Sequence, residues 1–158
     1  MGAFLVTFKP ESENSKRGWP LAKLQALVGR LRTSGTVQED WRFANHKKVT
    51  LGDRAFLLVQ GKLGPAIIGY GRVSGEPKND LGYWHTPIKF ENLVDPSTET
   101  LVSKDDVLAI KGGRRYWRTQ NSGIELPADI TNNLEALIVG KLPKELTEEQ
   151  LSNPVDER

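Results

Sequence analysis

Three apolar segments with the character of β-strands follow one another between residues 55 and 90, and their close spacing limits the folds open to the chain. The segments are AFLLV at 55–59, AIIGYGRV at 66–73 and YWHTPIKF at 83–90. A short turn joins the first two, and the polar loop 74–82 joins the second and third. A crossover between parallel strands needs a dozen or more residues, usually including a helix. The spacing therefore predicts a mixed or antiparallel sheet rather than regular βαβ units.

Glycine and proline inside these segments add local expectations. Gly69 and Gly71 interrupt the second segment and predict a bend or a close approach of two backbones. Pro87 lies inside the third segment and has no N–H to donate to a ladder, so we expect it at an edge or a bulge.

Two helices are expected to flank the strands. Trp19-Pro20 is a suitable start for the first, because proline is tolerated at the first helical position, and Gly35 is a suitable end. Its apolar stripe has helical spacing and consists of Leu24, Leu27, Val28 and Leu31. The second helix is expected over 129–139, with Gly140 as its stop.

The remaining expected elements are short. They are a strand at 3–9, a loop at 10–18, a helical turn at 104–109 and a brief strand at 123–126. The predicted fold class is therefore α+β: a small bent β-barrel of about five or six strands with helices packed outside it.

Length and charge predict one domain with an acidic tail. The 158 residues suit a single core, and we assign residues 1–143 to it. The tail 144–158 holds two cations and five carboxylates, a local charge of −3, and reads as a helix or linker. The formal net charge is +2, so the domain carries +5, which permits contact with phosphate without requiring it.

Cysteine and hydropathy point to a cytoplasmic protein. There is no cysteine, so disulfides and Cys-based zinc sites are excluded. No apolar run approaches the length of a membrane span, and 3–8 lacks the features of a signal peptide. We expect no membrane partner.

The sequence contains no recognisable catalytic constellation. His46 and His85 do not have the spacing of metal ligands, and no serine sits in a G-x-S-x-G turn. Asp105-Asp106 reads as a solvated helix start near Ser103. We therefore expect no enzyme activity, no catalytic residue, no metal and no cofactor.

Tryptophan and positive charge occur together at the ends of expected elements. Trp19, Trp41, Trp84 and Trp117 all lie at such junctions, and Trp117 sits inside the cationic run 111–118. Each could simply pack over the rim of the core. Rings at loop ends beside Lys and Arg are also what stacking on an unpaired base requires.

Two stretches carry a family resemblance. "WRFANHKKVTLGDRAFLLVQGKLGPAIIGYGRVSGEP" at 41–77 resembles an EVE domain of the PUA-like superfamily. "YWRTQNSGIELP" at 116–127 resembles the closing motif of an EVE subgroup that usually forms the amino-terminal half of modification-dependent restriction endonucleases, ahead of an HNH nuclease. The resemblance covers about residues 3–140 and implies a small bent β-barrel.

The resemblance implies a DNA-binding reader of a modified base, with 5-methylcytosine or 5-hydroxymethylcytosine as the leading ligands. Relatives with this barrel flip the base out of the duplex into an aromatic cage, and they serve restriction systems. No HNH nuclease follows in these 158 residues. We therefore expect a reading domain, free-standing or part of a longer nuclease, with a fused or associated nuclease as a possible partner.

The expected site draws on separated parts of the chain. For the base cage we predict Trp19, Trp41, Trp117, Asn45, Gln120, Ser122 and Gly123. For phosphate contact we predict Arg42, Lys47, Lys48, Arg114, Arg115 and Arg118. Tyr83 and Trp84 are a reserve aromatic pair. Asn45 and Ser122 could instead bond the backbone of local turns, and each cation could be a solvated surface charge.

Three other functions remain open at the level of sequence. PUA-like domains include RNA readers, and a caged base on a basic surface suits single-stranded RNA equally well. The barrel cleft could also hold a small molecule or a protein partner without any nucleic acid. A hydrolase with an unrecognised site is the third of these alternatives.

Overall fold

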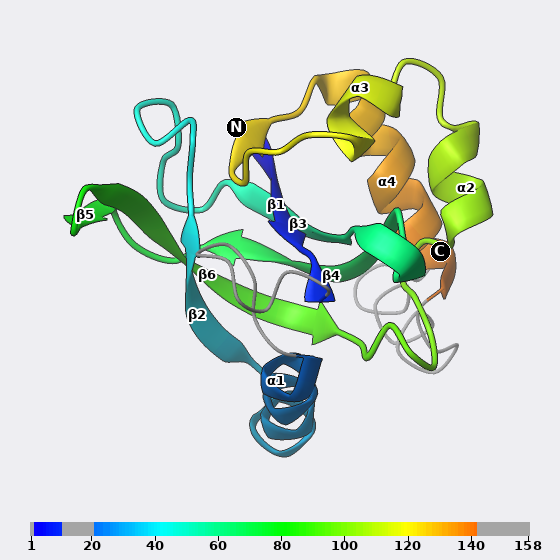
Figure 1. Ribbon diagram of the computed structural model, residues 1–158, viewed down its shortest axis with the longest axis horizontal. Helices are drawn as coiled ribbons and strands as arrows, with labels where there is room; N and C mark the ends of the chain where they lie inside the picture. Colours follow the sequence, from blue (N-terminus) through cyan, green and yellow to red (C-terminus); the bar gives the residue numbers. More distant parts are fainter. Residues whose placement is uncertain (1, 11–20, 142–158) are drawn as a thin grey trace, which may run out of the picture.

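The computed structural model describes residues 2–10 and 21–141, and these residues form a curled sheet with helices on both faces (Figure 1). The strands are β1 (Ala3–Phe8), β2 (Val37–Arg42), β3 (Arg54–Val59), β4 (Ala66–Val73), β5 (Lys78–Asp80), β6 (Tyr83–Leu93) and β7 (Ile124–Glu125). The helices are α1 (Leu21–Ser34), α2 (Lys104–Ala109), α3 (Arg114–Trp117) and α4 (Ala128–Lys141), with a 3₁₀ turn, η2 (Gly61–Leu63).

The sheet is mixed, as its strand spacing predicts. Its order is β2-β6-β4-β3-β1-β7, and β5 pairs with β6 outside this path. The pair β1–β3 is parallel and the other pairs are antiparallel. The first and last strands in chain order therefore come together, which is what brings residues near 5 and 124 into one region.

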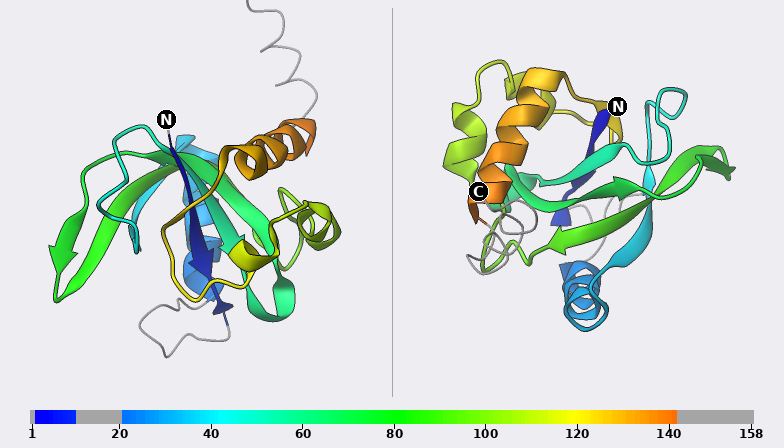
Figure 2. Two further views of the ribbon diagram at one scale, coloured as in Figure 1. Left: turned by 90° about the horizontal axis from the view of Figure 1, so that it is seen from above. Right: turned by 180° about the vertical axis from the view of Figure 1, so that it is seen from behind.

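Both faces of the central strands are buried, which explains their nearly continuous apolar sequence. In β1, Phe4 and Val6 belong to one core cluster, and Ala3 and Leu5 belong to another. The first cluster is covered by α1. The second is covered by α2, α3 and α4, which lie together on the opposite side of the sheet (Figures 1 and 2).

The sequence missed two strands. Residues 37–42 form β2, and 78–80, expected as part of a loop, form β5. Every residue of β5 is exposed, and only two of the six residues of β2, Val37 and Trp41, are buried. These short polar segments become strands because β6 offers them a partner, not through a pattern of their own.

Pro87 lies at neither an outer edge nor a bulge, which corrects the expectation for it. On one side it is in register with Asp40 of β2. On the other side its carbonyl accepts from the Ser74 amide, at the gap between the β4 ladder, which ends at Val73, and the β5 ladder, which starts at Lys78. The missing N–H of proline therefore costs no ladder bond there.

Gly71 confirms the expected close approach of two backbones. It sits at a register shift between β4 and β6. A Cβ built on Gly71 would lie 2.1 Å from the carbonyl oxygen of Lys89, so no larger residue fits without moving the strand.

The three expected helices are present with one change of length, and α3 was not expected; the predicted start of the first helix at Trp19-Pro20 lies outside the described residues. The Gly35 amide donates to the Leu31 carbonyl with a φ of +86°, which ends α1 as expected. Ser103 caps α2 by accepting from the Asp106 amide. The second expected helix continues through Gly140 to Lys141. No helix in residues 2–10 and 21–141 is long and apolar enough to cross a membrane. The tail 144–158 lies outside the described residues.

One carboxylate ties α4 to two strands of the sheet. Glu135 accepts from the Arg54 guanidinium at 2.6 Å through one oxygen and from the Tyr70 hydroxyl at 2.6 Å through the other. Burial, helped by the hydrogen bond to the Glu135 carboxylate, raises the pKa of Tyr70 to about 12. The neutral hydroxyl is therefore the form that the fold requires.

This contact predicts a loss of stability at high pH. The folded pKa of Tyr70 lies above its ordinary value of 10.0, so its contribution is complete below pH 10 and disappears as the pH rises through about 12. We expect the free energy of unfolding of the wild type to fall relative to that of Tyr70→Phe over this interval. Urea unfolding of both proteins from pH 8 to 12 measures the difference, and parallel curves would contradict the assignment.

Candidate functional site

The segment that follows β2 closes the curled sheet. The Phe43 amide donates to the Trp84 carbonyl at 2.9 Å, which extends the β2–β6 pairing by one residue. The next two amides then turn to the other end of the sheet: Ala44 donates to the Ser122 carbonyl at 2.7 Å and Asn45 to the Gly123 carbonyl at 2.9 Å. This segment therefore joins β6 to the approach of β7, and its two backbone hydrogen bonds link the two ends of the curled sheet.

Two predicted base-contacting side chains reinforce this closure. The Asn45 Oδ1 accepts from the Glu125 amide at 2.7 Å, and the Ser122 Oγ accepts from the Thr7 amide at 3.1 Å. Both bonds join segments far apart in sequence, so they differ from the local turn bonding weighed above. Ser122 keeps its hydroxyl proton and Asn45 its amide group for other partners.

Gly123 is required by the closure. Its φ is +79°, and a Cβ there would lie 2.4 Å from the Phe43 Cα. Its own amide donates to the Leu5 carbonyl at 2.8 Å. Gly123, predicted as part of the base cage, therefore allows a close approach of protein backbone to protein backbone.

A small pocket opens beside the closure. Its cavity volume is about 220 Å³, and it is lined by residues from β2, its following segment, the start of β6 and the approach to β7. Four of these residues carry rings: Phe43, His46, Tyr83 and Trp84. The volume is below the ~300–1,000 Å³ of pockets for drug-sized ligands, so a small flat group suits it best.

Two of the rings in the pocket are stacked on each other, and a third lies under a guanidinium group. His46 lies parallel to Trp84, with ring centroids 4.2 Å apart and planes within 6°. The Arg42 guanidinium lies 4.0 Å from the centre of the Tyr83 ring. Trp84 still exposes 36% of its surface, which is unusual for so large an apolar residue.

Polar groups lie at the same pocket. Ser122 and Asn121 contribute to its lining. The Nδ1 of His46 is buried and has no hydrogen-bond partner among the described residues. An unpaired buried polar atom costs about 1–3 kcal/mol, so a ligand that bonded this nitrogen would recover that free energy.

Positive charge follows the pocket along the chain. Lys47 and Lys48 come directly after His46 and are exposed. The Nζ of Lys48 lies 3.7 Å from a carboxylate oxygen of Glu125, but both side chains are largely in water. Such a pair contributes about 0–1 kcal/mol, so Lys48 can exchange this carboxylate for a phosphate at little cost.

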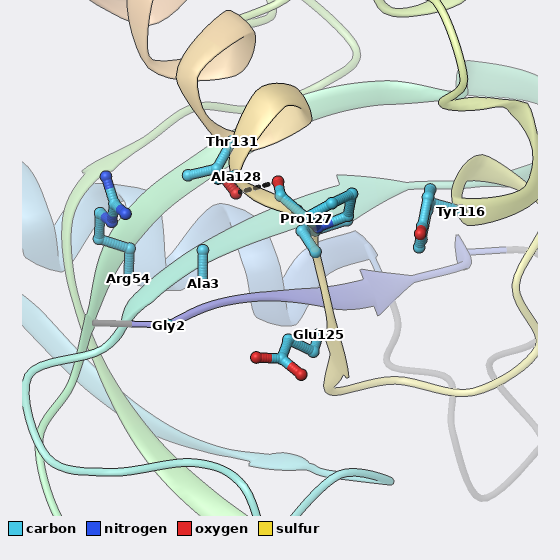
Figure 3. A pocket seen from close by; sticks show the side chains of 9 residues that line it. Gly2, Ala3, Arg54, Tyr116, Glu125, Pro127, Ala128 and Thr131 are labelled. Atoms are coloured by element: carbon cyan, nitrogen blue, oxygen red, sulfur yellow. Dashed lines mark hydrogen bonds between the residues drawn. The ribbon is translucent and has the colours of Figure 1, made fainter.

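A second, larger hollow lies between β1, β7 and the start of α4. Its cavity volume is about 420 Å³. Figure 3 shows Arg54, Tyr116 and Glu125 on separate sides of it, with the Thr131 hydroxyl donating to the Pro127 carbonyl. Tyr116 is its one aromatic lining residue, and a carboxylate shares the space. The small pocket is better suited to a flat, electron-rich group.

The structure does not bring Trp41 and Trp117 together. Trp41 is 6% exposed in the core cluster beneath α1, where its Nε1 donates to the Thr7 carbonyl at 3.0 Å. Trp117 is 4% exposed in the cluster on the other face of the sheet. The sheet separates the two indoles, so they do not form opposite walls of one cage. Trp19 lies outside the described residues.

The remaining predicted residues fall into two groups. Arg42 lines the small pocket, with Lys47 and Lys48 next along the chain. Arg114 and Arg115 are exposed on α3 and Arg118 is exposed just after it, and Gln120 is exposed on the same connection. The Arg115 guanidinium lies 5.0 Å from the Tyr116 ring. The predicted cations therefore border two separate regions.

Sequence reasoning missed His46 and Phe43 and ranked Tyr83 and Trp84 only as a reserve. The signal for the reserve pair was their place at the start of a strand. For His46, a histidine without metal-ligand spacing gave no reason to choose it. Among residues 2–10 and 21–141, no group of three or more His, Asp or Glu residues could hold a metal ion.

Comparisons with known proteins find likeness in structure but not in sequence. No protein-family model matches the sequence, and no curated protein sequence matches it. A hypothetical protein from Leishmania major superposes with a TM-score of 0.59 at 11% identity, over 95% of this chain and 96% of that chain. The Rhodopseudomonas palustris protein Rpa0253 superposes with a TM-score of 0.56 at 17% identity, over 92% and 97%.

Human THYN1 protein, in a complex with DNA that contains 5-methylcytosine, superposes with a TM-score of 0.57 at 13% identity. The match covers 90% of this chain and 100% of that chain. At these identities the likeness is one of fold. The curled sheet with its flanking helices is a PUA-like bent barrel, as the sequence predicts.

The closure at Gly123 yields a prediction with a matched control. Gly123→Ala places a Cβ against the Phe43 backbone and also strains a positive φ. We expect it to lower the free energy of unfolding by roughly 2–4 kcal/mol. Gly112→Ala has the same backbone cost, with a φ of +78°, but no atom within 4 Å of the new Cβ. Chemical denaturation of both variants isolates the contact, and equal losses would show that the closure does not need glycine.

Proposed function

We propose that this chain is a non-enzymatic reader of a modified base in nucleic acid, with 5-methylcytosine or 5-hydroxymethylcytosine in double-stranded DNA as its ligand. One observation carries the proposal: a pocket of about 220 Å³ has ring side chains, an unpaired buried nitrogen and nearby cations. The PUA-like fold supports it, since THYN1, which shares this fold, has been captured with methylated DNA.

The proposed mechanism is extrusion of one base from the duplex into this pocket. Extrusion costs a few kcal/mol of lost pairing and stacking. Stacking on an aromatic ring returns about 1–3 kcal/mol per base. Trp84 is our main candidate for this ring because it lines the pocket and remains 36% exposed although His46 is stacked on it. Tyr83, held under Arg42, is the second.

Hydrogen bonds to the base edge must offset part of the free energy of extrusion that stacking does not recover. Ser122 and Asn121 line the pocket and could offer a hydroxyl and an amide, and the His46 Nδ1 lacks a partner among the described residues. Asn45 and Gly123 act one step further away in this proposal, by holding the segment that carries His46 against the approach to β7. Gln120 remains a predicted edge contact.

The backbone of the nucleic acid would contact the cations beside the pocket. Arg42, Lys47 and Lys48 are the proposed phosphate contacts for the strand that carries the extruded base. Arg114, Arg115 and Arg118 are exposed at α3 and could reach phosphates further along the duplex. Phosphate contacts position a duplex without reading its sequence.

Of the three predicted cage indoles, two act in the core in this proposal. Trp41 supports the closure by bonding the Thr7 carbonyl, and Trp117 packs α3 onto the sheet. Trp19 remains a predicted wall of the cage.

Discrimination of the modification depends on fit. One buried CH₂-sized group is worth about 0.8 kcal/mol, or roughly a fourfold preference. Rejection of other bases must come from steric conflict or from polar groups left unpaired in the pocket. We further propose that the domain serves a restriction system together with a fused or associated HNH nuclease, following the EVE-like motifs at 41–77 and 116–127.

A binding panel tests the ligand. Duplexes of one sequence with cytosine, 5-methylcytosine, 5-hydroxymethylcytosine or N6-methyladenine, and one matching RNA, are titrated at several salt concentrations. We expect the tightest binding to a modified-cytosine duplex, and affinity that falls steeply with salt because phosphates release counterions. Equal affinity across the panel would end the modified-base proposal, and a preference for the RNA would establish the alternative RNA reader.

A pair of aromatic variants tests the pocket. Trp84→Ala should weaken binding to the preferred duplex roughly 5- to 150-fold, the equivalent of 1–3 kcal/mol of stacking. Tyr116→Ala removes the one ring of the larger hollow and should leave affinity near that of the wild type. Thermal unfolding of both variants controls for folding. The reverse outcome, a loss with Tyr116→Ala alone, would place the base in the larger hollow.

A further inference from the structure

The hairpin between β5 and β6 ends in an unusual residue. Leu81 exposes 90% of its surface, more than any other large hydrophobic residue among those described. It is also the one described non-glycine residue with a positive φ, at +54°. Exposure of a large apolar side chain to water is unfavourable, and so is a left-handed backbone conformation for leucine. Leu81 has both features.

The type of turn explains the positive φ of Leu81 but not the choice of leucine at this position. Asp80 pairs with Tyr83, so Leu81 and Gly82 form a two-residue turn in which both φ values are positive. Such turns favour Asn-Gly, Asp-Gly or Gly-Gly. Gly82 fits this preference, and its amide donates to the Asn79 Oδ1 at 3.3 Å. Leucine at the first position is less favourable than residues that tolerate this conformation, because its Cβ crowds the following carbonyl.

The hairpin places Leu81 beside the small pocket. Gly82, Tyr83 and Trp84, the next three residues, all line that pocket. The hairpin also projects from the body of the protein, away from the helices that cover the sheet (Figures 1 and 2). A partner that presents a group to the pocket would therefore meet the leucine side chain as well.

We propose that Leu81 is a wedge that enters the base stack and fills the gap left by the extruded base. This inference rests on the proposed function and adds the residue that keeps the base out of the duplex. Proteins that distort DNA commonly insert an apolar side chain between base steps. The side chain is buried only in the complex, so its exposure in the free protein is the cost of having it available.

The charges around the tip suit a wedge rather than a phosphate contact. Lys78 lies on β5, but Asp80 directly precedes Leu81 and both are exposed. The tip thus carries no excess positive charge, and Leu81 would act through apolar burial. Its removal should therefore lower affinity without changing the slope of log affinity against log salt concentration.

Two substitutions of Leu81 separate its binding role from folding. Leu81→Ala removes the wedge. Leu81→Asn also removes it but creates Asn-Gly, the preferred pair for this turn, and should raise the stability of the fold. Both should weaken binding to the preferred modified duplex about tenfold or more, given the 1.5–3 kcal/mol expected for burying a leucine. Leu108→Ala, an exposed leucine on α2, is the control and should leave binding unchanged.

The ligands in the test distinguish a wedge from a general contact. A single-stranded oligonucleotide with the same modified base has no stack to fill, so the Leu81 variants should bind it as the wild type does. With 2-aminopurine next to the target base in the duplex, the wild type should raise the fluorescence through unstacking, and Leu81→Asn should raise it much less.

The outcomes separate the wedge from the proposed function. A wild-type protein without preference for a modified duplex refutes the reader itself. A wild type that has this preference, with Leu81 variants that bind the duplex equally well, overturns the wedge and leaves the reader in place. Equal losses on duplex and single strand also overturn the wedge, because Leu81 would then contact the base or its strand directly.

Discussion

The pairing of Ala44 and Asn45 with Ser122 and Gly123 is the constraint on which the rest of the site depends. It joins the segment after β2 to the approach of β7, which are far apart in sequence, and thereby closes a curled sheet that would otherwise have two open ends. Open strand edges carry unpaired backbone groups, and these two bonds satisfy some of them. The small pocket is lined by residues that meet at this junction, so the backbone hydrogen bonds fix the relative positions of the segments that carry its side chains.

In this arrangement some polar residues hold the pocket together and others remain available to a ligand. Asn45 and Ser122 each accept a hydrogen bond from a distant backbone amide, which holds the walls of the pocket in place. In the proposed reader, the groups that would meet the base are the partly exposed Trp84 ring, the remaining hydrogen-bonding capacity of Ser122, and the His46 nitrogen that has no partner among the described residues. A preorganised pocket of this kind binds at lower entropic cost than one that must order itself around the base.

Much of the fold was predictable because its signals are local. The strands rich in Val, Ile, Leu and Phe are buried on both faces of the sheet and were recognised directly, as were the apolar stripe of α1 and the glycine that ends it. The segments β2 and β5 were missed because their six and three residues carry few apolar positions, and a strand partner decides their conformation. The same limit applies to Trp41 and Trp117: both follow a polar segment beside cations, yet both are core residues.

The sequence by itself determined the class of the fold, because strand spacing, apolar runs and turn glycines act over a few residues. It also singled out 41–77 and 116–127 by their family resemblance, and the structure shows that both stretches contain residues of the closure. Only the tertiary structure decided which side chains share a pocket. A residue's neighbours across the closure depend on the register of pairing between segments about 80 residues apart, and a side chain's face depends on the position of the whole sheet. Thus Trp41 and Trp117, alike in sequence context, lie on opposite faces, while His46 and Trp84 are stacked in contact.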